Sequence, residues 1–277
     1  MANWPEIDFS QSTEDIRKQF EKALKEIQSA LRSFLLSDAT RKDLLATEKE
    51  IRLILSDMEK YIDEWSSEAA ESSVTQALVA SLLMLGLAET VEEAREQTKL
   101  TRKQTALLDY AVESLRTDLK AVTANLERQT RSVIRRSYTD SMKRTSTQSQ
   151  TEISRAAKQM LADADIAIVD KAGRRWKTSN FIDVITKTRL METYRDIVAL
   201  EGIANGNGHG YINYNKSTTD RCKDFHFKIV KLAPDIESPY PYFRDLPHLG
   251  HPQCRHYPII ITNFDDVPTQ VKRANNL

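Results

Sequence analysis

The feature that most constrains this chain is the absence of helix-breaking residues over more than half of its length. No proline occurs between Pro5 and Pro234, and Gly86 is the only glycine before Gly173. Proline removes a helical hydrogen bond, and glycine costs about 1 kcal/mol relative to alanine inside a helix. Seven of the eight prolines lie from Pro234 onward. We therefore predict a long helical N-terminal region followed by a C-terminal region of different architecture.

Three stretches of the N-terminal region carry apolar residues at steps of three and four, which gives a helix one apolar face. The first stretch, over residues 13–36, has Ile16, Phe20, Leu24, Ile27, Leu31 and Phe34. The second has Leu44, Ile51, Leu55, Met58, Ile62 and Trp65. The third has Leu108, Val112, Leu115, Leu119, Val122 and Leu126. We expect most of these apolar faces to form an intramolecular core and the rest of them to be available for contact between subunits.

Two further features predict helices between the second and third stretches. Residues 74–87 are almost wholly apolar, which predicts a short separate helix inside the bundle. Thr90 is followed three residues later by Glu93, the spacing of a capping box. This spacing predicts that a new helix starts there.

The C-terminal region is expected to mix strands and helices. A β-hairpin is predicted from two strand-like segments, residues 166–169 and 174–177, with a turn at Gly173 between them. Glycine adopts the positive φ that a tight turn needs. A helix over about 179–203 and a strand over 257–262 complete this region. The expected fold class is therefore α+β.

The polar segment 145–151 contains no apolar residue, and it is the predicted joint between the two regions. We place an elongated helical region at 1–163, a small mixed domain at 164–265 and a C-terminal tail at 266–277. The longest apolar run, 78–87, is too short to span a bilayer, and the acidic N-terminus is unlike a signal peptide. We therefore expect that the protein does not associate with a membrane and that it is first located in the cytoplasm of a cell.

Charge is distributed unevenly along the chain. Residues 1–100 contain 12 basic and 20 acidic side chains, a net charge of −8, whereas residues 101–277 carry +8. This asymmetry indicates two surfaces with different partners.

All five histidines and both cysteines fall within less than a fifth of the chain. Five of these residues could supply thiolate and imidazole ligands to a tetrahedral zinc ion: Cys222, His226, His251, Cys254 and His256. The alternative is that the cysteines are small buried apolar residues and the histidines form hydrogen bonds within loops. Two cysteines are too few for a disulfide framework and are compatible with a reducing compartment.

The sequence lacks the common catalytic motifs. We find no paired-carboxylate pattern, phosphate-binding glycine loop or serine elbow. The glycines from Gly202 to Gly210 follow a predicted helix, so they predict a helix cap and turn. A Cys–His nucleophile or a histidine–metal nuclease is the alternative use of the cysteines and histidines. We expect no enzymatic activity.

A cluster of six basic residues follows the third apolar stretch, over residues 128–144, where Asp140 is the one acidic residue. Its members are Arg128, Arg131, Arg135, Arg136, Lys143 and Arg144. The first five fall on an arc of about 140° when a helix advances by 100° per residue. Such a face could neutralise the phosphates of duplex DNA without reading sequence. It could equally face solvent or an acidic protein surface.

Four segments in the C-terminal region together resemble a known family. They are Val-Asp-Lys-Ala-Gly-Arg-Arg-Trp at 169–176, Lys-Thr-Arg at 187–189, Thr-Asp-Arg-Cys at 219–222 and Leu-Gly-His-Pro-Gln-Cys-Arg-His at 249–256. In this order they resemble the C-terminal domain of phage Mu F-like minor head proteins and of related minor capsid proteins. The resemblance covers a little over a third of the chain.

The resemblance implies a virion structural protein in few copies that acts in head assembly, DNA packaging or ejection. It implies association with the portal and with capsid or scaffold proteins, at the capsid interior or portal vertex, after assembly in the host cytoplasm. Many relatives have a cysteine at the position of Phe225 and another at the position of His256, so a four-cysteine metal site is excluded here. The alternatives from other classes are a metal-dependent nucleic-acid enzyme and an effector delivered by the phage.

Overall fold

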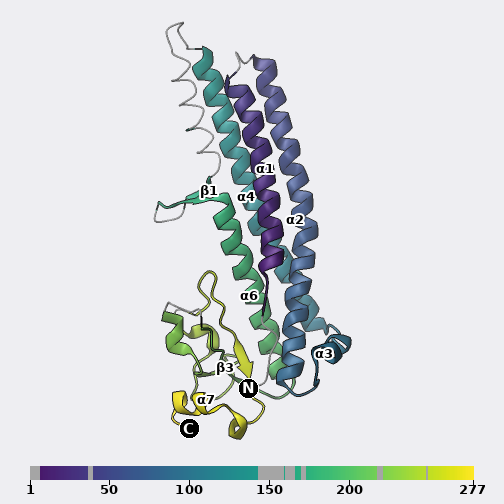
Figure 1. The fold of residues 1–277 in the computed structure, drawn as a ribbon, viewed down its shortest axis with the longest axis vertical. Helices are drawn as coiled ribbons and strands as arrows, with labels where there is room; N and C mark the ends of the chain where they lie inside the picture. The colour runs from purple at the N-terminus through teal and green to yellow at the C-terminus, as the bar shows by residue number, and fades with distance from the viewer. Residues whose placement is uncertain are drawn as a thin grey trace. The chain divides into compact units, whose positions relative to one another are not determined.

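The computed structural model describes residues 7–36, 40–142, 159, 166–169, 173–216, 221–247 and 249–277. Most of them are helical, and a three-stranded antiparallel sheet lies near the C-terminus (Figure 1). The chain therefore has the α+β architecture that the sequence predicts.

Two compact units make up the chain, and each combines segments that are distant in sequence. The helical unit contains Ser10–Ser66 and Leu115–Asp183. The mixed unit contains Met1–Phe9, Ser67–Ser114 and Val184–Leu277. The predicted domain boundary after residue 163 and the predicted joint at 145–151 lie outside the described residues.

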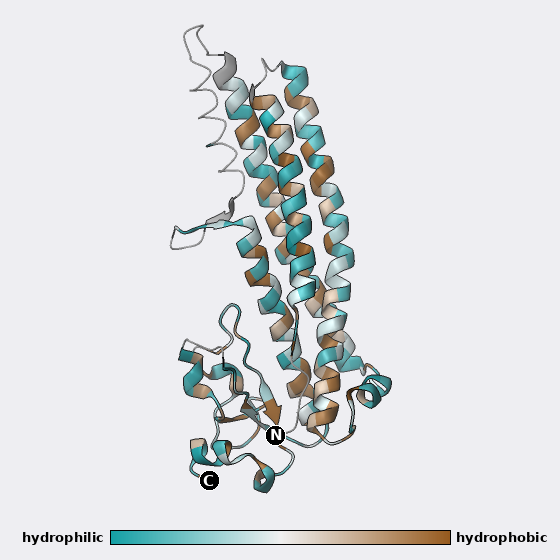
Figure 2. Cartoon of the chain, in the orientation of Figure 1, coloured by the Kyte–Doolittle hydropathy of each residue, from teal (hydrophilic) through white to brown (hydrophobic). Residues whose placement is uncertain are grey.

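The helical unit is built from α1 (Ser10–Leu36) and from parts of α2 (Arg41–Met84) and α4 (Arg102–Met142). All six apolar residues of the first stretch are buried, as are five of the second, while Leu44 is half-buried. Apolar residues recur along each of these helices in Figure 2. Trp65 Nε1 donates a 2.9 Å hydrogen bond to the main-chain oxygen of Ser12, which joins α2 to α1. The periodicity therefore predicted the core of this unit correctly.

The prediction of a separate helix at 74–87 was wrong, because these residues continue α2 without interruption to Met84. Nothing between residues 41 and 84 breaks a helix. The helix ends at Met84, and Gly86 follows with a φ of 67°, while Leu87 N donates to Leu82 O at 2.9 Å. This arrangement is a helix cap that glycine accommodates without strain.

The helix start predicted at Thr90 forms, although the Glu93 carboxylate accepts from Glu89 N at 2.8 Å and not from Thr90 N as in a capping box. The Thr90 hydroxyl accepts a hydrogen bond from Glu93 N at 3.2 Å, and α3 (Val91–Gln97) begins there. A second cap starts the long helix α4, where Gln104 Oε1 accepts from Thr101 N at 2.6 Å. This second cap was not predicted from the sequence. In the third stretch, Leu108 and Val112 are half-buried, and the other four residues are buried.

The predicted hairpin also forms, from β1 (Ile166–Val169) and β2 (Arg175–Lys177) paired antiparallel. Gly173 precedes β2 with a φ of 77°, a conformation that glycine adopts without strain, and residues 170–172 of the predicted turn lie outside the described residues. The helix predicted at 179–203 is α6 (Thr178–Ala204). It ends at Ala204, and the predicted cap follows at Gly206, which has a φ of 79°, through a 2.8 Å bond from Asn207 N to Gly202 O.

A three-stranded sheet of order β4-β3-β5 forms the centre of the mixed unit. Its strands are β3 (His209–Ile212), β4 (Ile229–Lys231) and β5 (Pro258–Ile260), and β5 confirms the strand predicted at 257–262. Short 3₁₀ helices η1 (Arg221–Phe225), η2 (Phe243–Asp245) and η3 (Phe264–Asp266) lie in the connections. Ser73 Oγ donates to the main-chain oxygen of Leu190 at 2.8 Å, so α2 contacts α6 within this unit.

The segment treated as a C-terminal tail contains α7 (Thr269–Asn275), which packs against the sheet. Val271 is fully buried beside Ile229 and Ile261. Asn275 Oδ1 accepts from Ile229 N at 3.0 Å, and Asn275 Nδ2 donates to Phe227 O at 2.8 Å. The last residues are thus part of the mixed unit. None of the described helices has the length and apolarity needed to cross a bilayer.

Candidate metal centre

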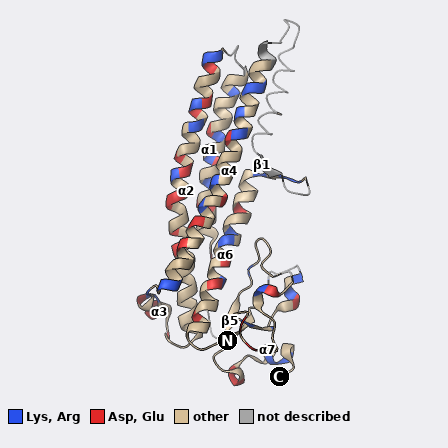
Figure 3. Ribbon diagram, turned by 180° about the vertical axis from the view of Figure 1, so that it is seen from behind, with Lys and Arg blue, Asp and Glu red and all other residues tan. Residues whose placement is uncertain are grey.

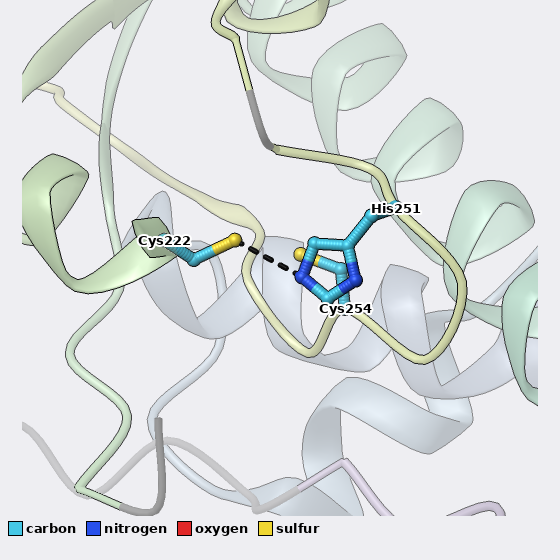
Figure 4. Close-up of side chains that lie close together, drawn as sticks. All are labelled: Cys222, His251 and Cys254. Atoms are coloured by element: carbon cyan, nitrogen blue, oxygen red, sulfur yellow. Dashed lines mark hydrogen bonds between the residues drawn. The ribbon is translucent and has the colours of Figure 1, made fainter. Parts of the chain in front are cut away.

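Three of the predicted ligands, Cys222, His251 and Cys254, converge in the mixed unit (Figure 4). Cys222 lies on η1, while His251 and Cys254 lie on the segment 249–256 that precedes β5, here called the closing loop. One ligand atom from each residue lies within 4.8 Å of the other two. The nearest pair is Cys222 Sγ and His251 Nε2, at 3.1 Å. The Cys–His–Cys cluster could hold a metal ion.

The backbone of the closing loop brings His251 and Cys254 to the same side. Cys254 N donates to the main-chain oxygen of His251 at 2.9 Å, which closes a turn between them. Gln253 occupies the left-handed region with a φ of 64°, a conformation that is costly for a residue with a side chain. Gln253 N also donates to Thr188 Oγ1 on α6 at 3.2 Å. The tertiary contact with α6 therefore helps to hold the turn.

Arg195 on α6 fixes the end of the closing loop. Its Nε donates to the main-chain oxygen of His256, and its Nη2 donates to that of Cys254, both at 2.6 Å. Burial lowers the pKa of the Arg195 guanidinium, while nearby groups, Cys254 first among them, oppose that shift. Arg195 was not predicted from the sequence. A signal was available, because Arg195 follows Thr188 by seven residues and so lies on the same face of the helix.

The other two predicted ligands pair with each other beside the cluster. His226 Nε2 lies 2.8 Å from His256 Nε2, and their ring centroids are 4.9 Å apart. The second ring nitrogen of His256, Nδ1, lies 3.5 Å from Cys254 Sγ. His256 is thus in contact with the three-residue cluster, and His226 is connected to it through His256.

The hydrogen bonds of His251 determine which of its ring nitrogens faces the cysteines as an acceptor. His251 Nδ1 lies 2.8 Å from the main-chain oxygen of Pro252. A carbonyl oxygen only accepts, so Nδ1 carries the proton and Nε2 presents its lone pair toward Cys222 Sγ. Metal-bound imidazoles commonly have this arrangement, in which the distal nitrogen donates to a carbonyl.

The remaining histidines do not belong to this site in the described part of the chain. His209 lies on β3, with Nε2 at 2.8 Å from Ser238 Oγ, and burial lowers its pKa. His248 lies outside the described residues.

A cavity of about 380 Å³ lies next to the closing loop, lined in part by α4, α6, His256 and Tyr257. Two ion pairs form part of its wall, Arg189 with Glu192 and Arg244 with Asp196. Burial raises the pKa of Asp196, and the hydrogen bond from Arg244 opposes this shift. The cationic charge in this wall is therefore partly neutralised.

The predicted basic face lies on α4 in the helical unit, where both charge signs are visible along α2 and α4 (Figure 3). Arg131 pairs with Glu127, and Arg135 Nε lies 3.0 Å from Glu48 Oε1. Arg128 and Arg136 instead contact the neutral side chains of Asn125 and Ser132. Lys143 and Arg144 lie outside the described residues.

Comparison of the chain with protein-family models, with curated proteins and with solved structures found no match in any of the three.

Proposed function

We propose that this chain is a minor head protein of a tailed bacteriophage, with a structural role and no enzymatic activity. The observation that carries the proposal is that two of the four family-like segments each contact a third, the closing loop, in the mixed unit. Thr188, in the segment 187–189, accepts a hydrogen bond from Gln253 of the closing loop. Cys222, which ends the segment 219–222, contacts His251 of the same loop.

These contacts matter because the segments are distant in sequence. Cys222 and His251 are 29 positions apart, and Thr188 and Gln253 are 65 apart. Short motifs that matched a family by coincidence would have no physical reason to converge. Their convergence on the closing loop supports the view that the three segments belong to the centre of a single domain.

We further propose that the Cys–His–Cys cluster holds Zn²⁺. Thiolate and imidazole are preferred ligands of this ion. The ligand atoms lie within 4.8 Å of one another, so small side-chain movements would bring them to the bond lengths of about 2.0–2.3 Å that one shared ion requires. Zinc would cross-link η1 to the closing loop and thereby stabilise the mixed unit.

In the proposed role the protein associates with the portal and with capsid or scaffold proteins, in the host cytoplasm during assembly and afterwards in the capsid interior or at the portal vertex. Non-specific contact with duplex DNA is assigned to the basic face on α4. Arg128 and Arg136 are its strongest candidates, because their described side-chain partners are neutral.

A metal-dependent nucleic-acid enzyme is the second candidate, and one observation favours it. A zinc ion with three protein ligands keeps a position for water, as catalytic sites do, and a cavity lies beside His256. A phage-delivered effector is the other alternative; no observation on the structure favours it.

The test is mass spectrometry of purified phage particles, with the portal protein as the internal reference. We expect this protein in every preparation, at a few copies per portal. Its absence from particles in which the portal is abundant would contradict the proposal. Incubation of the zinc-loaded protein with DNA and RNA tests the enzyme alternative, and hydrolysis that is lost in Cys254→Ser would favour that alternative.

A further inference from the structure

We infer that His256 is the fourth ligand of the metal site at Cys222, His251 and Cys254, so that the site is a closed Cys₂His₂ centre with His226 as a positioning residue. This inference rests on the zinc proposed above. It assigns the site a structural role, because four protein ligands leave no coordination position for substrate or water.

The distance between Cys254 and His256 fits two ligands of one ion. Cys254 Sγ and His256 Nδ1 are 3.5 Å apart. A tetrahedral ion with a Zn–S bond of about 2.3 Å and a Zn–N bond of about 2.0–2.1 Å separates these ligands by about 3.6 Å. This pair therefore already has the separation that shared coordination requires. The set of ligand atoms within 4.8 Å of one another contains Cys222, His251 and Cys254 but not His256, so closing the site requires the His256 ring to move toward the other two ligands.

Sequence spacing and Arg195 explain why this pair is held together. Cys254 and His256 are two positions apart, so an extended backbone directs both side chains to the same face. Arg195 donates to the main-chain oxygens of both residues, which fixes the backbone on either side of the exposed Arg255. The guanidinium thus acts as a clamp on two neighbouring ligands.

The hydrogen bond to His226 can fix the tautomer of His256 that a metal ligand needs. If His256 Nε2 donates its proton to His226 Nε2, then His256 Nδ1 presents a lone pair toward Cys254 Sγ. His251 is arranged in the same way, with one nitrogen bound to a carbonyl and the other directed at a cysteine. Both imidazoles thus have the outer-nitrogen partner that is typical of metal ligands.

Burial also favours a closed site over one with bound water. The exposed fraction is 0% for Cys222, 3% for Cys254 and 4% for His256. Only His251 among the four is half-buried.

Cobalt substitution of the full-length, reduced protein tests this inference. Co²⁺ reports thiolate ligands through sulfur-to-metal charge transfer and reports tetrahedral geometry through the intensity of its d–d bands. In the wild type we expect thiolate charge transfer together with intense tetrahedral bands. In His256→Ala we expect the charge transfer to persist, the d–d bands to change and the affinity to fall at least about tenfold. His209→Ala is the matched control, and its spectrum should equal that of the wild type.

A gain-of-signal variant keeps the test decisive if His256→Ala fails to fold. His256→Cys should add a third thiolate and raise the charge-transfer intensity by about half, because zinc-type sites accept either ligand. Unchanged spectra and affinity in both variants would overturn the assignment of His256 while leaving a three-ligand metal site intact. Absence of cobalt binding by the wild type would overturn the metal proposal itself.

The positioning role of His226 has its own readout. His226→Gln retains a side-chain oxygen that can accept from His256 Nε2, whereas His226→Leu removes the acceptor. We expect near-normal cobalt spectra and affinity for His226→Gln and about a tenfold loss of affinity for His226→Leu. Equal behaviour of the two variants would contradict the role assigned to this hydrogen bond.

Discussion

Arg195 Nε donates a 2.6 Å hydrogen bond to the main-chain oxygen of His256, 61 residues further along the chain. With its second bond to Cys254, this arginine satisfies the carbonyls of two buried residues in a loop that is otherwise exposed or half-buried. Such carbonyls are costly when they lose their donor, and the cost of each is about 1–3 kcal/mol.

Replacing this arginine should therefore destabilise the mixed unit. We expect Arg195→Met to lower the free energy of unfolding by about 2–4 kcal/mol, because two buried acceptors lose charged donors. Urea denaturation followed by intrinsic fluorescence measures the loss. Arg255→Met is the control, because Arg255 is exposed and a substitution there should change the free energy by less than about 0.5 kcal/mol. Equal losses in the two variants would rule out the clamp.

Removal of metal should lower the melting temperature of the mixed unit. Zinc that binds only the folded state adds about 2.7 kcal/mol when its free concentration is 100 times its dissociation constant. Differential scanning calorimetry with and without a zinc chelator tests this, and the same chelator should have no effect on Cys254→Ser. Far-UV circular dichroism should retain most of its helical signal, because α1 and most of α4 lie outside the unit that holds the site. Identical transitions with and without chelator would disprove zinc stabilisation.

Gly210 lies at a close approach of strands β3 and β5. A Cβ atom at this position would lie 2.8 Å from the main-chain oxygen of Ile259. Because that backbone is part of the sheet and cannot move easily, we expect Gly210→Ala to cost about 1–3 kcal/mol. Gly208→Ala is the matched control, since its Cβ would meet the flexible end of the Ile236 side chain. Thermal melts in which Gly208→Ala is the more damaging variant would refute this interpretation of the strand packing.

His209 should make stability depend on pH. Burial lowers its pKa in the folded chain, so the unfolded chain binds a proton more readily below the ordinary value of about 6.5. The free energy of unfolding should thus fall as the pH is lowered through that value and level off below the folded pKa. His209→Gln can retain a bond to Ser238 but does not titrate. Urea unfolding from about pH 7.5 to about pH 5 should give a shallower dependence in the variant, and parallel curves would contradict the prediction.

Contact with DNA should depend more on Arg128 and Arg136 than on Arg131 and Arg135, whose charges are partly neutralised by glutamates. The logarithm of the binding constant falls linearly with the logarithm of the salt concentration, and each phosphate contact adds about −0.9 to the slope of this line. Removing an arginine that contacts one phosphate should therefore flatten the slope by about 0.9. We expect the double variant Arg128→Ala, Arg136→Ala to flatten the slope by about 2 units and Arg131→Ala, Arg135→Ala by less than about 1. Fluorescence anisotropy with duplexes of unrelated sequence measures both. Equal slopes in wild type and both variants would indicate that this face docks on protein or faces solvent.

Local patterns in the sequence were sufficient to predict most secondary structure. The stripe that begins at Ile16 and the cap at Thr90 depend on residues within a few positions of each other, so periodicity and spacing report them directly. The same reasoning failed at 74–87, where an apolar composition suggested a separate helix although no residue ends α2 before Met84. It also missed α7, because Val271 and Asn275 are stabilised by strand β4 more than by neighbours in sequence.

The sequence by itself determined which residue types were available for a metal site and that they lie in one short window. Only the tertiary structure decided which of them meet. Cys222 reaches His251 across 29 positions, His226 pairs with His256, and Arg195 arrives from a helix that the window does not include. Contacts of this kind depend on how η1, the closing loop and α6 pack in three dimensions. The spacing of residues along the chain carries no information about that packing, because loop lengths fix neither the direction nor the distance of the side chains they connect.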